Sequence, residues 1–193
     1  QPLEDGTVTI SRARSTTCFP AAFMLITSMN PCPCGYRGDP NRDCQCTVPQ
    51  VERYMSKISG PLLDRIDIHL EVSAVPFDEL AAKQPGTSSD AIREQVGVAR
   101  EIQQKRFEHS RSLGHRWNAR MTTREVRHHC HIEKKPMDLL RTAVSNLGLS
   151  ARAHDKVLRV ARTIADLDRA ETICAQHISE AIQYRLLDRK LWT

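Results

Sequence analysis

The 193-residue sequence is poor in aromatic side chains and contains no long apolar run. Aromatic residues make up 5% of the chain, while 40% of the residues are hydrophobic, so we expect a mainly aliphatic core. No apolar stretch approaches the ~20 residues that a membrane-spanning helix needs. The N-terminus also lacks the basic and then apolar pattern of a signal peptide. We therefore expect a cytoplasmic protein without a membrane partner.

A motif for phosphate binding is missing as well. No G-x-x-x-x-G-K-[ST] sequence occurs anywhere in the chain, so the glycine-rich loop that cradles phosphates in many nucleotide hydrolases is absent. The chain also begins Gln1-Pro2-Leu3, without a start methionine. We interpret it as the C-terminal portion of a larger protein, and we expect this portion alone to hold no complete nucleotide site.

The net charge of +5 is concentrated in one stretch. Residues 100–127 hold eight Lys or Arg against three acids, which equals the whole excess, so the rest of the chain is neutral on balance. Such a stretch suits a phosphate backbone as partner, and it equally suits a solvated helical face followed by a charged loop. Both interpretations stay open at this point.

Seven cysteines, an odd number without a secretory signal, argue against a disulfide framework. Four of them form two C-x-C pairs separated by nine residues, and these are Cys32, Cys34, Cys44 and Cys46. Four thiolates in a short loop predict a tetrahedral zinc site, although C-x₂-C spacing is commoner. A reduced metal-free loop, an oxidised loop and an iron site are the alternatives. The run His128–His131 is a poorer chelator, because adjacent helical residues point in different directions, and we expect it to be exposed.

The apolar patterns predict strands first and helices afterwards. The first part contains a β-hairpin over residues 7–22, a buried strand over 22–27, a cysteine-rich loop over 31–47, a helix over 49–58 and a strand over 66–73. The second part contains a helix capped by Ser89, a helix over 136–147 ended by Gly148, a helix capped by Ser150 and a helix over 175–189. The expected fold class is an α/β remnant, residues 1–80, a linker, 81–90, and an all-α domain, 91–193.

Two polar residues stand where a nucleotide hydrolase places catalytic groups. Asn30 follows the expected strand 22–27, and an amide at the carboxyl end of a buried strand can position a γ-phosphate and an attacking water. An Asn-Pro turn is the alternative. Arg65 stands at the start of the strand expected over 66–73, where a guanidinium can stabilise transferring phosphate. Its alternative is an ion pair with Asp64 or Asp67.

Arg152 follows the expected cap Ser150 by two residues. A cation in the first turn of a helix opposes the helix dipole, so an anionic ligand would relieve the mismatch. A solvated arginine is the alternative.

Several of these segments together resemble one protein family. The segments are Val8–Ala13, Asn30–Gly35, Ser59–Asp67, Ser150–Ala153 and Val160–Leu167. In order and spacing they are similar to those of the bacterial magnesium-chelatase-like AAA+ ATPases of the YifB/ComM type, over nearly the whole chain. The resemblance implies the C-terminal part of an AAA+ core, with the hairpin and two core strands, followed by a helical lid. It also implies that the Walker A and B motifs lie upstream.

The resemblance assigns roles to the candidate residues. Asn30 would be sensor 1, Arg65 an arginine finger in the neighbouring subunit's site, and Arg152 sensor 2, acting in its own subunit or in the neighbour. Arg12 and Arg14 would lie near the tip of a hairpin that touches DNA phosphates inside a ring, unless the hairpin only faces solvent. ATP and Mg²⁺ would serve the full-length protein, which would form a homo-oligomeric ring, expected to be a hexamer.

The function implied is ATP-driven work on DNA, such as branch migration during natural transformation. We expect the fragment alone to be inactive as an ATPase. A chelatase-type subunit that remodels a partner enzyme is one alternative. The other is a zinc-stabilised module that binds nucleic acid or protein without hydrolysis.

Overall fold

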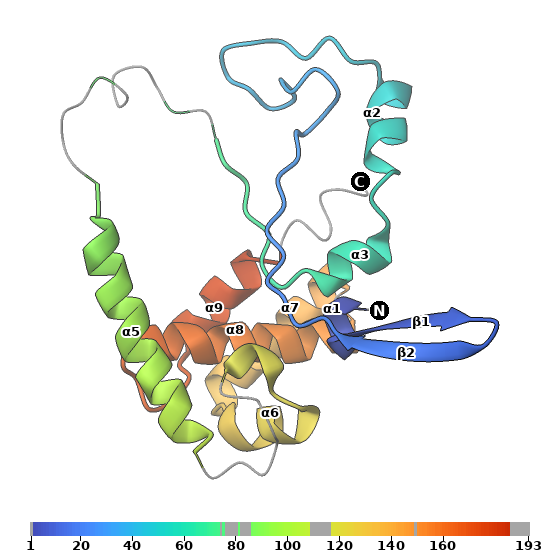
Figure 1. The fold of residues 1–193 in the computed structure, drawn as a ribbon. Coiled ribbons are helices and arrows are strands. Elements are labelled where there is room, and N and C mark those ends of the chain that lie inside the picture. Colours follow the sequence, from blue (N-terminus) through green and yellow to red (C-terminus); the bar gives the residue numbers. More distant parts are fainter. Residues whose placement is uncertain are drawn as a thin grey trace. The chain divides into compact units, whose positions relative to one another are not determined.

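The structure is a computed structural model that describes residues 2–73, 75, 81, 86–108, 117–148 and 150–185 (Figure 1). The chain divides into two compact units, residues 1–66 and residues 67–193. Among the described residues, the first unit holds a short helix, a β-hairpin and two further helices, and the second holds helices and an isolated β-bridge between Ile132 and Ile173. No helix that the structure describes has both the length and the apolar character needed to cross a bilayer.

The predicted hairpin is confirmed. After helix α1 (Pro2–Asp5), strand β1 (Thr7–Arg12) pairs antiparallel with β2 (Ser15–Pro20), and Arg12 faces Ser15 next to the turn (Figure 1). The alternation of Thr, Val and Ile in β1 favours a pleated strand. Nearly every residue of the two strands is exposed, so the hairpin is a ribbon without a packed face.

The two core strands expected over 22–27 and 66–73 are a wrong prediction for the described chain. Both segments are irregular, and their large apolar side chains are open to solvent: Met24 is 82% exposed, Ile26 80% and Val72 88%. A strand buried on both faces forms only when neighbouring strands accept its backbone hydrogen bonds and its side chains are covered. Within the residues described, β1 and β2 pair with each other and offer these segments no such neighbour.

Two helices follow the cysteine-rich loop. Helix α2 (Val48–Met55) begins after Thr47, whose backbone N–H donates to Gln50 Oε1 at 2.9 Å, and it confirms the helix predicted here. Helix α3 (Gly60–Arg65) was not predicted, although Ser59 is a recognisable cap that accepts a bond from Leu62 N at 3.3 Å. Arg65 is therefore the last residue of a helix and not the first residue of a strand.

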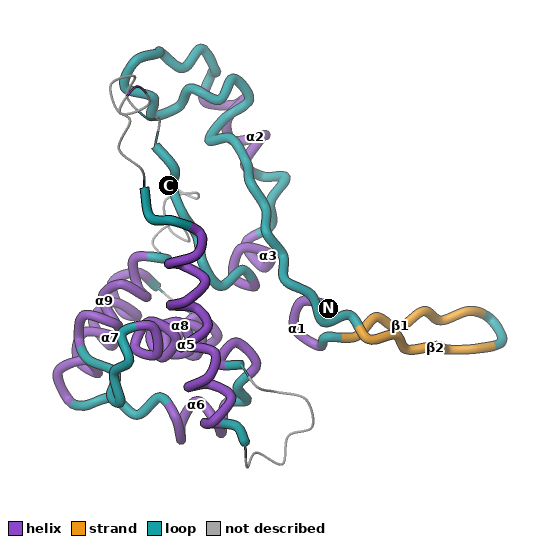
Figure 2. Tube along the Cα trace, turned by 60° about the vertical axis from the view of Figure 1, so that its left-hand side comes forward, coloured by secondary structure: helices purple, strands orange, loops and turns teal. Residues whose placement is uncertain are grey.

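The second unit is helical, as predicted. It consists of α5 (Ser89–Arg106), the 3₁₀ turn η1 (Asn118–Arg120), α6 (Thr123–His129), α7 (Lys134–Leu147), α8 (Ala151–Leu167) and α9 (Ala175–Gln183). Helix α8 lies at the centre and contacts α5, α6, η1 and α9, and Figure 2 shows this gathering of helices. Its residues Val157, Ala161 and Ala165 are fully buried at helical spacing and form the core with side chains of α6, α7 and α9.

The helix ends follow from local chemistry. Ser150 caps α8 and accepts from Ala153 N at 3.1 Å, and Gly148 ends α7 in the left-handed conformation at φ 60°, both as predicted. Helix α5 is capped by Ser88, which accepts from Ala91 N at 3.2 Å, so Ser89 was the wrong cap by one residue. The last helix ends at Gln183, and the predicted end at 189 lies outside the described residues.

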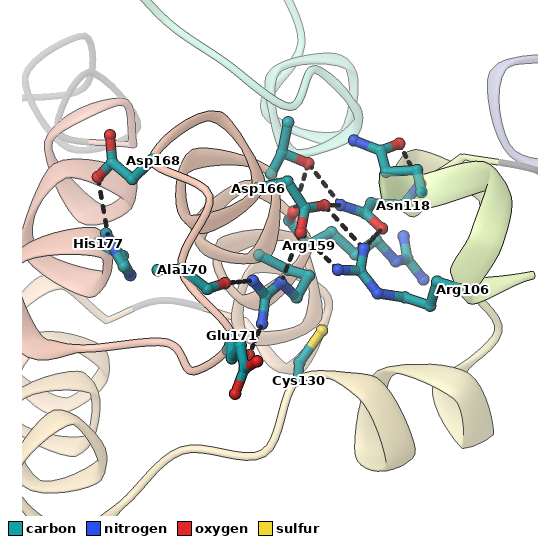
Figure 3. Close-up of polar contacts among 12 residues, drawn as sticks. Arg106, Asn118, Cys130, Arg159, Asp166, Asp168, Ala170, Glu171 and His177 are labelled. Atoms are coloured by element: carbon teal, nitrogen blue, oxygen red, sulfur yellow. Dashed lines mark hydrogen bonds and ion pairs between the residues drawn. The ribbon is translucent and has the colours of Figure 1, made fainter. Parts of the chain in front are cut away.

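A buried charge cluster ties α5, η1 and α8 together (Figure 3). Asp166 is fully buried and pairs with Arg106 and Arg162, and it also accepts from Asn118 Nδ2 at 2.7 Å. Arg162 in turn donates to the backbone oxygens of Ala170 and Glu171, at 2.5 and 2.8 Å. Because the Arg106 side chain lies in this buried cluster, the basic stretch 100–127 is not a solvated face throughout.

Candidate functional site

The four cysteines of the two C-x-C pairs come together in one cluster. Their sulfur atoms all lie within 4.8 Å of one another, and the Sγ–Sγ distances are 3.3 Å for Cys32–Cys34 and 3.6 Å for both Cys32–Cys44 and Cys34–Cys44. A disulfide would need about 2.0 Å, so these are free thiols. Within the part of the chain that is described, this is the group with the ligand set of a metal centre.

The cluster has the dimensions of a zinc site. Zinc–thiolate bonds of about 2.3 Å in a regular tetrahedron place the sulfurs about 3.8 Å apart. The three separations, 3.3, 3.6 and 3.6 Å, are shorter than that value by about 0.2 to 0.5 Å. Cys32 is fully buried and the other three are half-buried, as suits a structural site closed on all four sides.

The loop shifts the pKa values of its thiols in opposite directions. A backbone hydrogen bond from Tyr36, assisted by the neighbouring Cys32 side chain, lowers the pKa of Cys34 to about 6. The backbone of Cys34 also bonds to Cys46, but burial and the neighbouring sulfurs outweigh it and raise the pKa of Cys46 to about 12. Four thiols this close cannot all ionise unless a positive charge lies among them. A divalent cation with a preference for sulfur would supply that charge.

Hydrogen bonds within the loop also hold it closed. Gly35 donates to Cys32 O at 3.0 Å and takes φ 85°, a left-handed conformation that favours glycine at this turn. Arg42 Nη1 donates to the Tyr36 hydroxyl at 2.8 Å and its guanidinium lies 5.1 Å from the centre of the Tyr36 ring. The nine residues between the C-x-C pairs thus form a compact lobe that holds both pairs in place.

Asn30 lies beside this lobe. A β-carbon placed on Gly35 would be 3.7 Å from Asn30 Nδ2, so the amide is in contact range of the turn that carries Cys32 and Cys34. The side chain is exposed, and it follows an irregular segment instead of the expected strand. A metal in the loop would therefore brace the backbone on which Asn30 stands.

Two interactions fix the orientation of the Arg65 side chain. Its Nη1 donates to Pro61 O at 2.8 Å in its own helix, and its Nη2 lies 3.1 Å from Glu4 Oε2 of α1. About a quarter of the side chain remains exposed. Glu4 is a partner that the sequence pattern did not suggest, whereas Asp67 pairs with Lys156 at 2.9 Å. The structure brings Asn30 to the cysteine lobe and Arg65 to Glu4.

Arg152 stands in the first turn of α8, where it was predicted, and lines a groove together with Arg127 of α6.

Arg12 ends β1 and Arg14 lies in the hairpin turn, and both are exposed. In the run His128–His131, the two end histidines are exposed but Cys130 is buried in the core, which corrects the expectation that the whole run is exposed. The groove at Arg127, like the pairing of Arg65 with Glu4, was not indicated by the sequence patterns.

Comparisons with known proteins cover both units. The family model described as magnesium chelatase, subunit ChlI, matches residues 1–80, and the model described as magnesium chelatase, subunit ChlI C-terminal, matches residues 86–185. The chain is 40% identical over 193 residues to the protein YifB of Escherichia coli K12, covering 99% of this chain and 36% of that protein. It is 40% identical over 194 residues to the competence protein ComM of Haemophilus influenzae, with the same two shares. The chain thus spans about a third of the length of these curated relatives.

Proposed function

Because this chain belongs to the magnesium-chelatase-like family of AAA+-type ATPases and is of the YifB/ComM type, we propose that it is the sensor and lid portion of an ATP-driven ring motor that acts on DNA. Its 193 residues contain no P-loop, so in this proposal the full-length protein supplies the loop that holds the phosphates. The Haemophilus relative is named a competence protein, which supports a role in natural transformation.

The observation that carries the proposal is the setting of Arg65. The guanidinium is held at the end of α3 by Pro61 O and by Glu4, and part of the side chain remains open to solvent. An arginine oriented in advance costs little to bring onto a phosphoryl group, where it stabilises the charge that develops in transfer. The carboxylate of Glu4 holds the cation in place until a phosphate competes for it.

Asn30 and Arg152 complete the proposed machinery. The amide of Asn30 would hydrogen-bond the attacking water and a γ-phosphate oxygen of ATP, which is a positioning role without proton transfer. Arg152 would contact the phosphates from the first turn of α8, where the helix dipole also favours an anion. Magnesium, bound with the nucleotide in the full-length protein, would neutralise part of the phosphate charge.

Zinc is part of the proposal. The sulfur separations of 3.3 to 3.6 Å and the backbone donors toward the sulfurs support a zinc ion held by Cys32, Cys34, Cys44 and Cys46. Its role would be structural, since four protein ligands leave no open position for a substrate or water. The ion would hold the lobe beside Asn30 rigid. It would thereby keep the Asn30 amide in its position.

DNA contact is assigned to the hairpin. Arg12 is exposed beside the turn and Arg14 is exposed within it, on a ribbon whose strands carry no packed face. Such side chains contact phosphates and do not read bases. A ring of hairpins from several copies would surround a strand without sequence preference.

The proposal is tested by mixing two inactive variants of the full-length protein. Arg65→Ala should still bind ATP but lose hydrolysis by about 10³- to 10⁵-fold, because a finger acts mainly on the transition state. When it is mixed with a variant whose P-loop lysine is replaced, activity should return in part, since some interfaces then pair an intact pocket with an intact finger. Arg93→Ala, which removes an arginine that is 75% exposed on α5, is the matched control and should retain activity. A flat baseline at every mixing ratio, with ring assembly verified, would refute a finger acting between subunits.

Two alternatives are separated by simpler measurements. A chelatase-type ATPase that remodels a partner enzyme would hydrolyse ATP without stimulation by DNA. A zinc-stabilised binding module would bind nucleic acid or protein but show no hydrolysis in the full-length protein. An ATPase assay of the full-length protein with and without branched or single-stranded DNA distinguishes all three.

A further inference from the structure

A groove of about 510 Å³ lies in the first unit between the cysteine lobe (residues 32–46) and α2. Its volume is within the range of pockets that hold small organic groups. The residues that line it come from the lobe, from α2 and from the turn after α2, and they are Pro33, Cys34, Gln45, Cys46, Gln50, Arg53, Tyr54 and Lys57. Apart from the two cysteines, no motif or family resemblance gave these residues a role.

Two cations stand on the helical side of the groove. Arg53 and Lys57 are exposed, and within the described part of the chain neither side chain has a hydrogen bond or an ion pair. The helical turn continues past the end of α2, because Ser56 N donates to Glu52 O at 2.8 Å and Lys57 N donates to Tyr54 O at 3.3 Å. Lys57 therefore follows Arg53 by about one helical turn, and the two cations line the same wall.

The negative groups nearby do not neutralise these cations. Residues 32–57 are all described, and none of their carboxylates lines the groove; these carboxylates are Asp39, Asp43 and Glu52. With zinc bound, four thiolates would exceed the charge of the ion. Backbone N–H groups bond to the sulfurs, those of Tyr36 and Gln45 to Cys34 among them, and they spread that excess charge over the loop. The exposed guanidinium and ammonium groups stay open to an anion from solvent.

The groove also offers a ring and an oriented amide. Tyr54 is half-buried, and its ring lines the groove together with Pro33. Gln50 Oε1 accepts from Thr47 N at 2.9 Å, which fixes the amide and leaves its NH₂ group to donate to a ligand. Proteins hold single-stranded nucleic acid with this combination, since cations bind the phosphates and a base stacks on an aromatic ring.

Other anionic polymers match the groove less well. A duplex keeps its bases paired and stacked on one another, so it has no free base to place on the Tyr54 ring. An acidic peptide would pair with the cations but brings no base to stack on that ring. A single strand satisfies the cations, the ring and the amide together.

We propose that this groove binds a single-stranded segment of DNA, with a base on Tyr54 and phosphates on Arg53 and Lys57. The inference deepens the proposed function, on which it rests for DNA as the substrate. It adds a second contact to the one assigned to the hairpin, and it favours unpaired DNA over duplex. Because Pro33 and Gln45 belong to the cysteine lobe, the groove depends on the four cysteines that hold the lobe together.

The test measures binding of the 193-residue chain, purified without chelator, to three fluorescent probes by anisotropy. The probes are a mixed-sequence oligonucleotide of about 15 nucleotides, the duplex with its complement and a polyglutamate peptide. We expect the single strand to bind most tightly. Tyr54→Leu should weaken its binding by about 5- to 100-fold, the range for the loss of one stacked base, whereas Tyr54→Phe keeps the ring and should keep the affinity.

A second variant tests the cations without disturbing the packing. Arg53→Gln combined with Lys57→Gln replaces two exposed side chains, and it should lower the salt slope for the single strand by about 1.4, as for two lost phosphate contacts. Arg141→Gln, which removes an exposed arginine of α7, is the matched control and should leave the affinity and the salt slope unchanged.

The outcomes separate this inference from the proposed function. An unchanged affinity in Tyr54→Leu, or an unchanged salt slope in the double variant, would show that the groove is not a DNA site. Tighter binding of the duplex or of polyglutamate would overturn the assignment to single-stranded DNA. If the groove variants weaken binding of the single strand while DNA fails to stimulate ATP hydrolysis by the full-length protein, the groove inference stands and the DNA-driven motor fails.

Discussion

Replacing Asp166 by asparagine should destabilise the helical unit severely. The carboxylate is fully buried and is shared by Arg106 and Arg162, whose side chains are 14% and 4% exposed. Asn118 Nδ2 donates to the same group at 2.7 Å. Asparagine keeps the shape but removes the negative charge, so two largely buried guanidinium groups lose their counter-ion.

The expected cost is about 3–5 kcal/mol, the usual penalty for removing one partner of a buried ion pair. For a unit of this size that corresponds to a fall in Tm of roughly 10–20 °C. It is also a large share of the whole stability of a domain, about 5–15 kcal/mol. The three elements that the cluster joins, α5, η1 and α8, should loosen together.

The measurement is urea unfolding of the 193-residue chain followed by far-ultraviolet circular dichroism. Asp138→Asn is the matched control, because it removes a carboxylate that is 54% exposed and lies 3.5 Å from Arg141 on the same helix. Exposed pairs of this kind contribute about 0.3–0.5 kcal/mol, so the control should be close to neutral. A loss below about 1 kcal/mol for Asp166→Asn would show that the cluster does not hold these helices together.

Three further predictions concern the cysteines and the hairpin. Protein purified without chelator should contain one zinc per chain by elemental analysis, and Cys44→Ser should lose it while Cys18→Ser, outside the cluster, retains it; protein without metal would remove the zinc assignment. Burial raises the pKa of Cys130 to about 11, so under native conditions at pH 7 iodoacetamide should modify it far more slowly than the exposed Cys18, and equal rates in mass spectrometry would contradict the buried position. Replacing Arg12 and Arg14 by alanine in the full-length protein should weaken DNA binding equally for all sequences and lower the salt slope by about 2, as for two lost phosphate contacts, and an unchanged affinity would move the contact to the stretch 100–127.

The strands show where sequence patterns failed. Residues 22–27 are apolar and short enough for a buried strand, but a strand is stabilised by neighbours that the segment does not encode. In the described chain those neighbours are missing, and Met24 and Ile26 remain exposed. The hairpin was predictable because its partner strand follows after a two-residue turn.

The helical part was predictable for the opposite reason. The cap at Ser150, the left-handed Gly148 and the apolar stripe of α8 depend on interactions between residues at most a few positions apart. The short helices α3 and α6 were not predicted, because one or two helical turns show too little apolar periodicity.

The sequence alone determined the helical caps, the two C-x-C pairs, the absence of a P-loop and the family resemblance, because each is a local pattern of residue types. The tertiary structure determined which other residues they contact. It brought four sulfurs within 4.8 Å, joined Arg106 to Asp166 across 60 residues, and placed Arg127 on the same groove as Arg152. Long-range pairings of this kind follow from how the whole chain packs, since the free energy that forms them comes from burial shared among many side chains and not from the paired residues themselves.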